Sequence, residues 1–271
     1  MEHDLSLRGP EARSAPVATL CAMFDHAVAT APDKVALRHS GVALTYREVG
    51  RAVAALARRL APIVTPGEVV ALVLPNSIEF HVAYFAALKV LAVPALLNPH
   101  YPAIELSPLL RKVSPRAVVC APATRDTVAG LADDLGIPRT VCLGQEIEIR
   151  ELFAQAEAPL ELRSATSEDP GALFFSGGTT GLPKAIEQTH GRLVTTARCI
   201  QHVWPTRADG ISSSSPSAIP IPARSTGTTV SFFPAMTGAC MVVSGVSILR
   251  VVSGRLRVTS YPISSVISRN S

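Results

Sequence analysis

The chain has 271 residues, of which 48% are hydrophobic, so it can fill the core of one large domain or of two small ones. Its net charge of +4 comes from dispersed arginines with few aromatic residues among them, which argues against a nucleic-acid partner. No window has the roughly 18 to 20 continuous apolar residues that a membrane-spanning helix needs, so no membrane span is expected.

The N-terminus and the cysteines bear on where the protein works. Residues 1–16 are charged and lack an apolar core, so we expect a flexible start and no secretory signal. The five cysteines are Cys21, Cys120, Cys142, Cys199 and Cys240. They show neither a CxxC pair nor the spacing of metal ligands, a pattern typical of a reducing compartment. We therefore expect a soluble, cytoplasmic protein with no metal site among its cysteines.

Residues 17–165 alternate between strand-like and helix-like segments. Thr45 and Glu48 have the spacing of a capping box, and apolar residues then recur at helical intervals up to Leu60. The following run EVVALVLP, at 68–75, has the β-branched, apolar character of a strand buried on both faces. Asn76 and Glu79 then predict the start of another helix.

The same alternation continues along the chain. Buried strands are predicted at 116–121 and 139–143, with a helix at 124–136 between them. Strands that alternate with helices of this length predict the α/β class, with a parallel sheet and right-handed crossovers. A polar, proline-containing connection then predicts a subdomain boundary after residue 165. Residues 166–209 would begin a second subdomain, with strands at 171–176 and 184–189 and a helix at 190–204.

The two strands of the second subdomain flank a loop of small and hydroxylated residues that ends in a lysine. Its glycines let the backbone approach a ligand closely, and successive amides there can form an anion-binding nest. The hydroxyls add donors, and the lysine adds a mobile ammonium. The residues concerned are Ser176, Gly177, Gly178, Thr179, Thr180, Gly181 and Lys184. Together they predict a binding site for a polyphosphate.

Other interpretations of this loop are less favourable. Leu182 and Pro183 separate Gly181 from Lys184, and a strand follows, so the loop differs from the Walker pattern. It also differs from GxGxxG at the start of a helix, so a dinucleotide fold is not supported. A short SGG alone would be an ordinary turn, whereas the whole string SGGTTGLPK between apolar strands favours a functional loop.

The string FFSGGTTGLPKAIEQTH, at 174–190, resembles the phosphate-binding signature of the AMP-forming acyl-adenylate synthetases, a superfamily that includes acyl-CoA and aryl-acid ligases. The stretches at 32–49, 74–106 and 115–119 resemble other parts of the family pattern in the same order. The resemblance covers residues 17–205, and beyond them FFPAMTGACMVV and RVTSYP resemble the family weakly. It implies the N-terminal, incomplete portion of an adenylate-forming ligase large domain, with parallel-rich sheets flanked by helices.

The resemblance also implies an activity. In this family a carboxylate attacks the α-phosphate of MgATP, and CoA or the phosphopantetheine of a carrier protein then takes the acyl group. The implied partners are therefore a small-molecule carboxylic acid, ATP, Mg²⁺ and an acceptor thiol. By resemblance the seven loop residues hold the β- and γ-phosphates. His190, in the TH pair after the loop, would contact the ligand or serve the structure.

Several parts of the family pattern are missing from this sequence. There is no Tyr-Gly-x-Thr-Glu segment with its magnesium-binding Glu, and no Thr-Gly-Asp segment with its ribose-binding Asp. No lysine follows Lys184, so the family's C-terminal catalytic lysine is absent as well. Leu91 stands where the family tends to have glycine, and AIPIPARSTG lacks the histidine of the substrate-side motif. The sequence therefore assigns no catalytic residue and predicts an impaired ligase or a non-catalytic nucleotide-binding or interaction remnant.

Residues 210–271 differ in character from the rest of the chain. About a quarter of them are serine, and no Asp or Glu follows Asp209. The segment still contains apolar runs that a disordered tail would lack. It is either an authentic but atypical half-domain or the product of a changed reading frame with early truncation, and we favour the second hypothesis. A coding sequence whose other two frames show no continuation of the family pattern would contradict the frame change.

Overall fold

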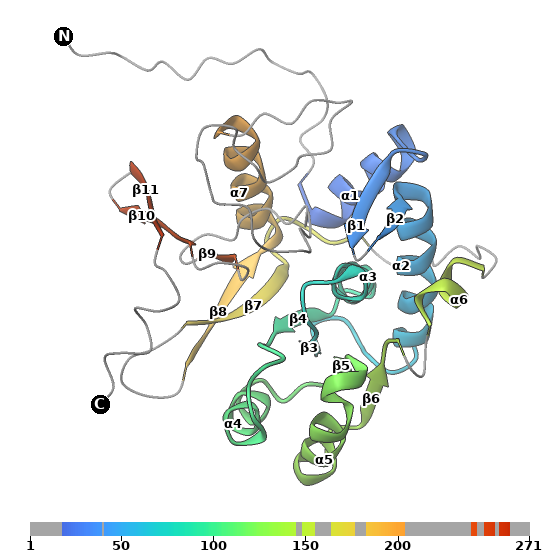
Figure 1. Ribbon diagram of the computed structural model, residues 1–271, viewed down its shortest axis with the longest axis vertical. Coiled ribbons are helices and arrows are strands. Elements are labelled where there is room, and N and C mark those ends of the chain that lie inside the picture. The colour runs from blue at the N-terminus through green and yellow to red at the C-terminus, as the bar shows by residue number, and fades with distance from the viewer. Residues whose placement is uncertain are drawn as a thin grey trace.

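The structure is a computed structural model that describes residues 18–39, 41–144, 148–154, 164–176, 183–203, 240–242, 247–252 and 255–260 (Figure 1). The largest sheet contains the strands β3 (Val69–Val73), β4 (Val93–Leu96), β5 (Ala117–Cys120), β6 (Arg139–Cys142), β7 (Pro170–Ser176) and β8 (Lys184–Thr189). It has six strands in the order β6-β5-β3-β4-β7-β8. Every neighbouring pair is parallel except β7 and β8, which are antiparallel. The predicted α/β class and parallel-rich sheet are confirmed.

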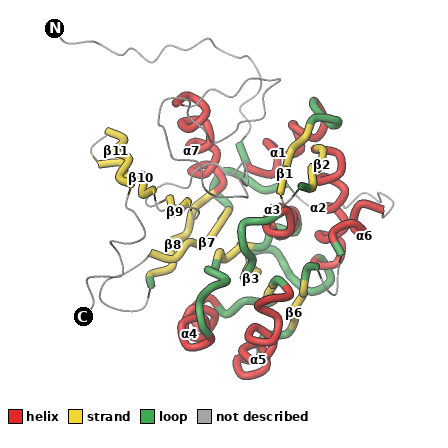
Figure 2. The backbone as a smooth tube through the Cα atoms, in the orientation of Figure 1, coloured by secondary structure: helices red, strands yellow, loops and turns green. Residues whose placement is uncertain are grey.

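Helices cover both faces of this sheet, as Figure 2 shows. The helices of the described residues are α1 (Leu20–Thr30), α2 (Tyr46–Leu60), α3 (Ile78–Lys89), α4 (Ala103–Val113), α5 (Arg125–Leu135), α6 (Ile149–Ala154) and α7 (His190–Val203), of which α6 packs against α2. A short 3₁₀ turn at Pro122–Thr124 precedes α5. Val70 and Leu72 of β3 face the cluster that contains α2 and α3, whereas Ala71 and Val73 face α4 and α5. This alternation explains why β3 is apolar on consecutive residues.

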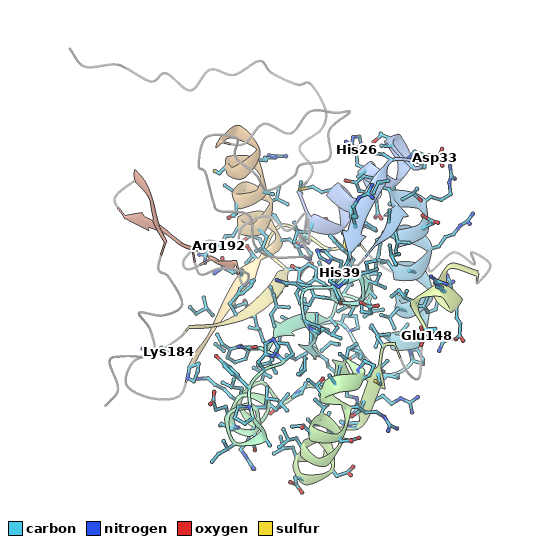
Figure 3. All side chains as sticks on the ribbon, viewed as in Figure 1. His26, Asp33, His39, Glu148, Lys184 and Arg192 are labelled. Carbon is cyan, nitrogen blue, oxygen red and sulfur yellow. The ribbon has the colours of Figure 1, made fainter. Side chains whose placement is uncertain are left out.

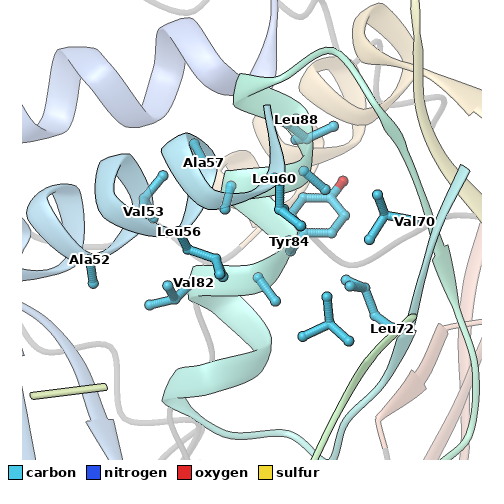
Figure 4. Packing of buried hydrophobic residues seen from close by; sticks show 14 of the residues in the cluster. Ala52, Val53, Leu56, Ala57, Leu60, Val70, Leu72, Val82, Tyr84 and Leu88 are labelled. Atoms are coloured by element: carbon cyan, nitrogen blue, oxygen red, sulfur yellow. The ribbon is translucent and has the colours of Figure 1, made fainter. Parts of the chain in front are cut away.

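The larger core cluster forms where α2 and α3 pack on the sheet (Figure 4). Leu56 and Leu60 of α2 are fully buried, as are Tyr84 of α3 and Leu72 of β3. The predicted capping box at the start of α2 is present, because the Thr45 hydroxyl accepts from the Glu48 amide and the Glu48 carboxylate accepts from the Thr45 amide. The cap fixes the start of α2, and its apolar face then meets α3.

The start of α3 differs from the prediction by one residue. The N-cap is Ser77, whose hydroxyl accepts a hydrogen bond from the Phe80 amide at 3.3 Å. Asn76 was expected to take this place. Both residue types are good caps, so local chemistry alone does not separate them. The geometry decides for Ser77, because its backbone is extended and the helix begins directly after it.

Leu91 adopts a positive φ of 58°, in the left-handed region that favours glycine. It follows the C-cap of α3, where many helices end in a left-handed residue. Its amide donates to the Leu88 carbonyl, and its own carbonyl accepts from the Gly67 amide at 2.8 Å. Leu91 stands where the family tends to have glycine. The left-handed backbone gives a physical reason why glycine would suit this position.

Two smaller sheets complete the described fold. The antiparallel pair β1 (Val35–His39) and β2 (Val42–Thr45) leads directly into α2. The strands β9 (Cys240–Val242), β10 (Ser247–Val252) and β11 (Arg255–Ser260) form a three-stranded antiparallel sheet in the order β11-β10-β9. This second sheet lies inside the serine-rich segment at 210–271. The origin of that segment stays a hypothesis.

The large sheet continues across the subdomain boundary predicted after residue 165. β7 pairs in parallel with β4 through Ala95 and Leu173, so it extends the sheet of the first segment. The division into residues 17–165 and 166–209 stays a prediction, and the flexible start at 1–16 lies outside the described residues. Within the described ranges, none of the helices combines the length and the apolar character that crossing a bilayer requires.

Candidate triphosphate-binding site

The predicted phosphate loop closes the hairpin between β7 and β8. Ser176, the last residue of β7, is the Cα partner of Lys184, the first residue of β8. The chain therefore leaves the sheet at Ser176 and returns to it at Lys184. Gly177, Gly178, Thr179, Thr180 and Gly181 lie between them, outside the described residues. Their predicted phosphate contacts stay predictions, as do those of Ser176 and Lys184.

The hairpin opens at the edge of the sheet where parallel α/β proteins bind ligands. β7 runs parallel to β4, so the loop after β7 and the connection after β4 leave the sheet at the same edge. In open α/β sheets, ligands bind outside the carboxyl ends of the strands. The topology thus agrees with a ligand at this loop.

Ser176 and Lys184 form the end of the β7–β8 pair from which the loop extends, called the hairpin mouth below. The Lys184 side chain is exposed there (Figure 3). The residue before it, Pro183, accepts a hydrogen bond through its carbonyl from the Lys112 ammonium at 3.4 Å. Lys112 belongs to the last turn of α4 and is also exposed. This contact brings the end of α4 to the residue before Lys184, although 71 residues separate Lys112 from Pro183 in the chain.

The other end of β7 is fixed by buried contacts. The hydroxyl of the fully buried Tyr84 donates to the Gly171 carbonyl at 3.0 Å, which ties α3 to β7. A Cβ atom on Gly171 would come within 2.7 Å of the Leu193 side chain and 3.3 Å of the His190 amide nitrogen. An added Cβ would therefore move the end of the Leu193 side chain and press on the backbone of α7, so glycine suits this close approach of α7 to β7. The loop thus follows a strand whose first residues contact both α3 and α7.

His190 is the first residue of α7, and its side chain is only 2% exposed. Its amide donates to the Asp169 carbonyl at 3.0 Å, and its Nδ1 accepts from the Leu20 amide at 3.3 Å. Accepting at Nδ1 requires the neutral ring with its proton on Nε2. Burial lowers the pKa of His190, and the nearby Asp169 carboxylate opposes that shift. The histidine therefore joins the start of α1 to the start of α7.

This position separates His190 from the loop. Lys184 begins β8 and His190 follows its last residue, so the six-residue strand lies between them. A strand of that length spans about 20 Å. The geometry favours the structural role of the two that the sequence left open, and a contact with the ligand stays a prediction.

Sequence reasoning found the loop but missed the residues that support it. Tyr84 and Gly171 lie inside apolar stretches in which nothing distinguishes them from ordinary core residues. Lys112 is a single lysine at a helix end, where basic residues are common. In the part of the chain that the structure describes, no three His, Cys, Asp or Glu side chains gather in a way that could hold a metal ion.

The match to known proteins covers most of the chain. The family model for AMP-binding enzyme matches residues 24–259. The chain belongs to this family.

Curated relatives agree with the family. The salicyl-AMP ligase / salicyl-S-ArCP synthetase of Mycobacterium tuberculosis is 31% identical over 198 residues, which are 66% of this chain and 34% of that protein. The 4-coumarate-CoA ligase 1 of Narcissus pseudonarcissus is 33% identical over 162 residues, which are 56% of this chain and 29% of that protein. The dimodular nonribosomal peptide synthase of Bacillus subtilis is 28% identical, but this chain covers only 8% of it. The chain thus spans about a third or less of these relatives.

Solved structures give the same picture. The acetoacetyl-CoA synthetase of Streptomyces lividans matches with a TM-score of 0.61 and 29% identity, over 68% of this chain and 32% of that one. A long-chain-fatty-acid-CoA ligase of Archaeoglobus fulgidus matches with a TM-score of 0.61 over 69% of this chain and 40% of that one. At 24% identity, the second match supports the fold alone. The chain has the fold of part of an adenylate-forming ligase.

Proposed function

We propose that this AMP-binding family member carries the triphosphate-binding part of an ATP-dependent acid–thiol ligase. Such a ligase activates a carboxylic acid to acyl-AMP and transfers the acyl group to CoA or to the phosphopantetheine thiol of a carrier protein. Two relatives support this direction by name, one as a salicyl-AMP ligase and one as a 4-coumarate-CoA ligase. The substrate would be a small carboxylic acid.

The observation that supports the proposal is the pairing of the two residues that border the loop, at the hairpin mouth. Ser176 and Lys184 face each other across the antiparallel pair, at the carboxyl edge of a parallel sheet. This pairing returns the chain to the point where the loop begins, and we propose that the Lys184 ammonium binds the same ligand as the hydroxyls and amides of the loop. Together these groups suit a polyphosphate, which needs several donors and positive charge in a small volume.

The chemistry sets what this site must do. A carboxylate oxygen attacks the α-phosphorus of ATP, the bond from that phosphorus to the bridging oxygen breaks, and pyrophosphate leaves. A thiol sulfur then attacks the acyl carbon, and AMP leaves with the electrons of the mixed-anhydride bond. The first step needs the β- and γ-phosphates to be held and neutralised while the attack occurs in line. That is the role we propose for the seven loop residues.

Among the residues that the structure describes, no cluster of ligands fits the Mg²⁺ that the family implies. Magnesium prefers oxygen ligands and is usually bound through one or two carboxylates. The sequence has no Asp or Glu after Asp209, and the described residues bring no three potential ligands together. The proposal therefore includes no step through the metal.

Titrating ATP against the 271-residue chain and its Lys184→Ala variant tests the proposal. We expect saturable binding that the variant weakens about tenfold or more, because hydrogen bonds to charged groups contribute about 1.5–3 kcal/mol. Arg192→Ala is the matched control, since Arg192 is exposed on α7, away from the hairpin mouth (Figure 3). Equal ATP affinity in the wild type and the Lys184 variant would reject the site.

A second candidate is a non-catalytic nucleotide-binding or interaction remnant. The observation that favours it is the absence of any lysine after Lys184 and of any carboxylate after Asp209 within the 271 residues. Lys184-dependent ATP binding without pyrophosphate exchange would support this candidate over the ligase.

A further inference from the structure

Two cysteines meet across the neighbouring strands β5 and β6. Cys120 is the last residue of β5 and Cys142 is the last residue of β6, and the two are Cα partners in the parallel register. The Leu143 amide donates to the Cys120 carbonyl at 3.0 Å, which fixes the register at this pair. All of α5 lies between the two cysteines in the chain, so the fold brings them together.

Both side chains lie on the same face of the sheet. Residues in register on adjacent strands share a face, and Cys120 and Cys142 belong to the core cluster that includes Val128 and Leu131 of α5. Each cysteine is 0% exposed. Neighbouring strands lie about 4.8 Å apart, and the Cα atoms of a disulfide are usually about 4.4–6.8 Å apart. The backbone therefore holds the two residues at a separation that a disulfide can bridge.

We propose that Cys120 and Cys142 form a redox modification site, which a low-molecular-weight disulfide such as glutathione disulfide oxidises to a reversible bond between β5 and β6. Both residues are thiols in the structure. One cysteine thiolate attacks a sulfur of glutathione disulfide, and one glutathione leaves as its thiolate. The second cysteine thiolate then attacks the protein sulfur of the mixed disulfide and releases the second glutathione. The two protein thiols lose two electrons and two protons, and glutathione disulfide gains them.

The oxidant reaches these buried thiols through local opening of β6. This strand is four residues long and is the outer strand of the described six-stranded sheet, whereas β5 lies between β6 and β3. Strand ends at the edge of a sheet open at a lower free energy than central strands. Cys142 is therefore exposed first. Oxidation should be slow, because a thiol in apolar surroundings is a poor nucleophile.

The bond would tie the outer strand to the rest of the sheet. A cross-link between β5 and β6 closes a loop that contains α5, and it restricts the unfolded chain. The oxidised chain should therefore be more stable than the reduced chain. In a reducing compartment such bonds are usually transient and serve redox sensing.

Packing alone is the alternative role for the two residues. Cysteine is among the most frequently buried residue types and packs as a small apolar side chain. In that role each thiol would react by itself, and only when the chain unfolds. The two roles therefore differ in the product that an oxidant gives with the folded chain.

The test equilibrates the full 271-residue chain in glutathione buffers of increasing oxidised-to-reduced ratio, blocks the remaining thiols with iodoacetamide and digests the chain with trypsin without reductant. Cys120 lies in the tryptic peptide 117–125 and Cys142 in the peptide 140–150, and each peptide contains one cysteine. Mass spectrometry detects the bond as a linked pair that is two hydrogens lighter than the two peptides together. Cys120→Ala and Cys142→Ala remove the site, and Cys21→Ala, at a partly buried cysteine of α1, is the matched control.

We expect the linked pair to become the main form of both peptides as the buffer becomes more oxidising, and dithiothreitol to reverse it. The oxidised chain should melt about 5–10 °C above the reduced chain, the effect of one cross-link in a protein of this size. Cys142→Ala should lose this shift, and Cys21→Ala should keep it.

Three outcomes would overturn the inference. One is that the exposed Cys199 gains glutathione, which shows that the oxidant is active, while the peptides 117–125 and 140–150 stay unlinked. Another is a linked pair that forms only in urea, because the folded register would then not be its cause. The third is a melting temperature that oxidation leaves unchanged or lowers. The wild type alone decides all three, so an alanine variant that fails to fold does not affect the test.

Discussion

His190 shows how one buried side chain can join helices that are far apart in the sequence. Its Nδ1 accepts from the Leu20 amide at the start of α1, and its own amide donates to Asp169 before β7. The first amides of a helix have no partner within the helix, so an acceptor from elsewhere satisfies one of them. The ring must be neutral to do this.

We expect His190→Ala to destabilise the chain by about 1–3 kcal/mol, because it leaves the Leu20 amide without its acceptor. His190→Asn should cost less, since the amide oxygen of asparagine can replace Nδ1 as the acceptor. Urea unfolding at neutral pH measures both variants. Equal losses for the two variants would mean that packing of the ring matters and the hydrogen bond does not.

The same residue predicts how stability changes with pH. Burial lowers the pKa of His190 and of the buried His81; at His81 the hydrogen bond with the Ser77 carbonyl opposes the shift, and the neighbouring His39 adds to it. Both rings are neutral in the folded chain at a pH where the unfolded chain already binds protons. The stabilisation is therefore complete above the ordinary pKa of 6.5 and is lost as pH falls below it toward the lowered values.

Urea unfolding between about pH 8 and pH 5 should show this loss, with a slope of at most about 1.4 kcal/mol per pH unit for each histidine. His190→Asn removes one titrating group and should make the slope smaller. An unchanged slope in this variant would contradict the assignment to His190.

At the residue scale, sequence reasoning succeeded where the chemistry was local. The capping box of Thr45 and Glu48 depends on residues three apart, so the sequence alone predicts it. The contact of Lys112 with Pro183 depends on how α4 packs beside the hairpin, so no local sequence pattern predicts it. The choice of Ser77 over Asn76 as a cap also came only from the backbone.

At the scale of elements, the ends of helices follow backbone conformation more than side-chain chemistry. Gly136 ends α5 with a φ of 65°, and Leu91 follows α3 with a φ of 58°. Glycine adopts this region without strain, whereas the left-handed conformation costs a residue with a side chain roughly 1–2 kcal/mol of conformational energy. Glycine inside a helix has the opposite effect, because there it adds only backbone freedom to the unfolded chain.

Helix α5 contains both situations and allows a matched test. Gly130→Ala, in the exposed interior of α5, should stabilise the chain by about 1 kcal/mol. Gly136→Ala, at the left-handed end, should destabilise it by about 1 kcal/mol. An added Cβ meets nothing within 4 Å at either site, so steric clashes do not contribute to the difference in stability between the two variants.

Urea unfolding of the two single variants measures the difference. The substitution reduces the freedom of the unfolded chain similarly at both positions, so the opposite signs must come from the folded state. Changes of the same sign would mean that the end of α5 does not hold its left-handed conformation.

The elements that could be predicted were those with a strong pattern. The strands at the centre of the sheet are short apolar runs, and β3, β5 and β6 lie where the sequence placed them. The hairpin of β1 and β2 was missed, because its alternation is short and its residues are mostly half-buried or exposed. Such a pair depends on its neighbours, and sequence propensity alone does not reveal them.

At the scale of the whole molecule, the sheet and the ligase activity could be predicted from the sequence to different extents. The six-stranded sheet is built from strands within residues 69–189, and its core is packed on both faces. The order of strands was not predictable, because it depends on contacts between segments that are distant in sequence. The family resemblance predicts a role for the loop, and this chain covers only 34% of the salicyl-AMP ligase that it matches.

Activity of the 271-residue chain is therefore the last prediction. We expect ATP–pyrophosphate exchange to be at or near background with a panel of fatty and aromatic acids, while Lys184-dependent ATP binding is retained. The 271 residues contain no lysine after Lys184 and no Asp or Glu after Asp209. Losing one preorganised group that stabilises charge typically costs about 10² to 10³ in rate, and here several are absent together.

A longer relative supplies the control for this experiment. The 4-coumarate-CoA ligase 1 of Narcissus pseudonarcissus, assayed with 4-coumarate under the same conditions, shows that the assay detects exchange. Robust exchange by the present chain would mean that its own residues provide the missing charges, which would overturn the expectation of impairment.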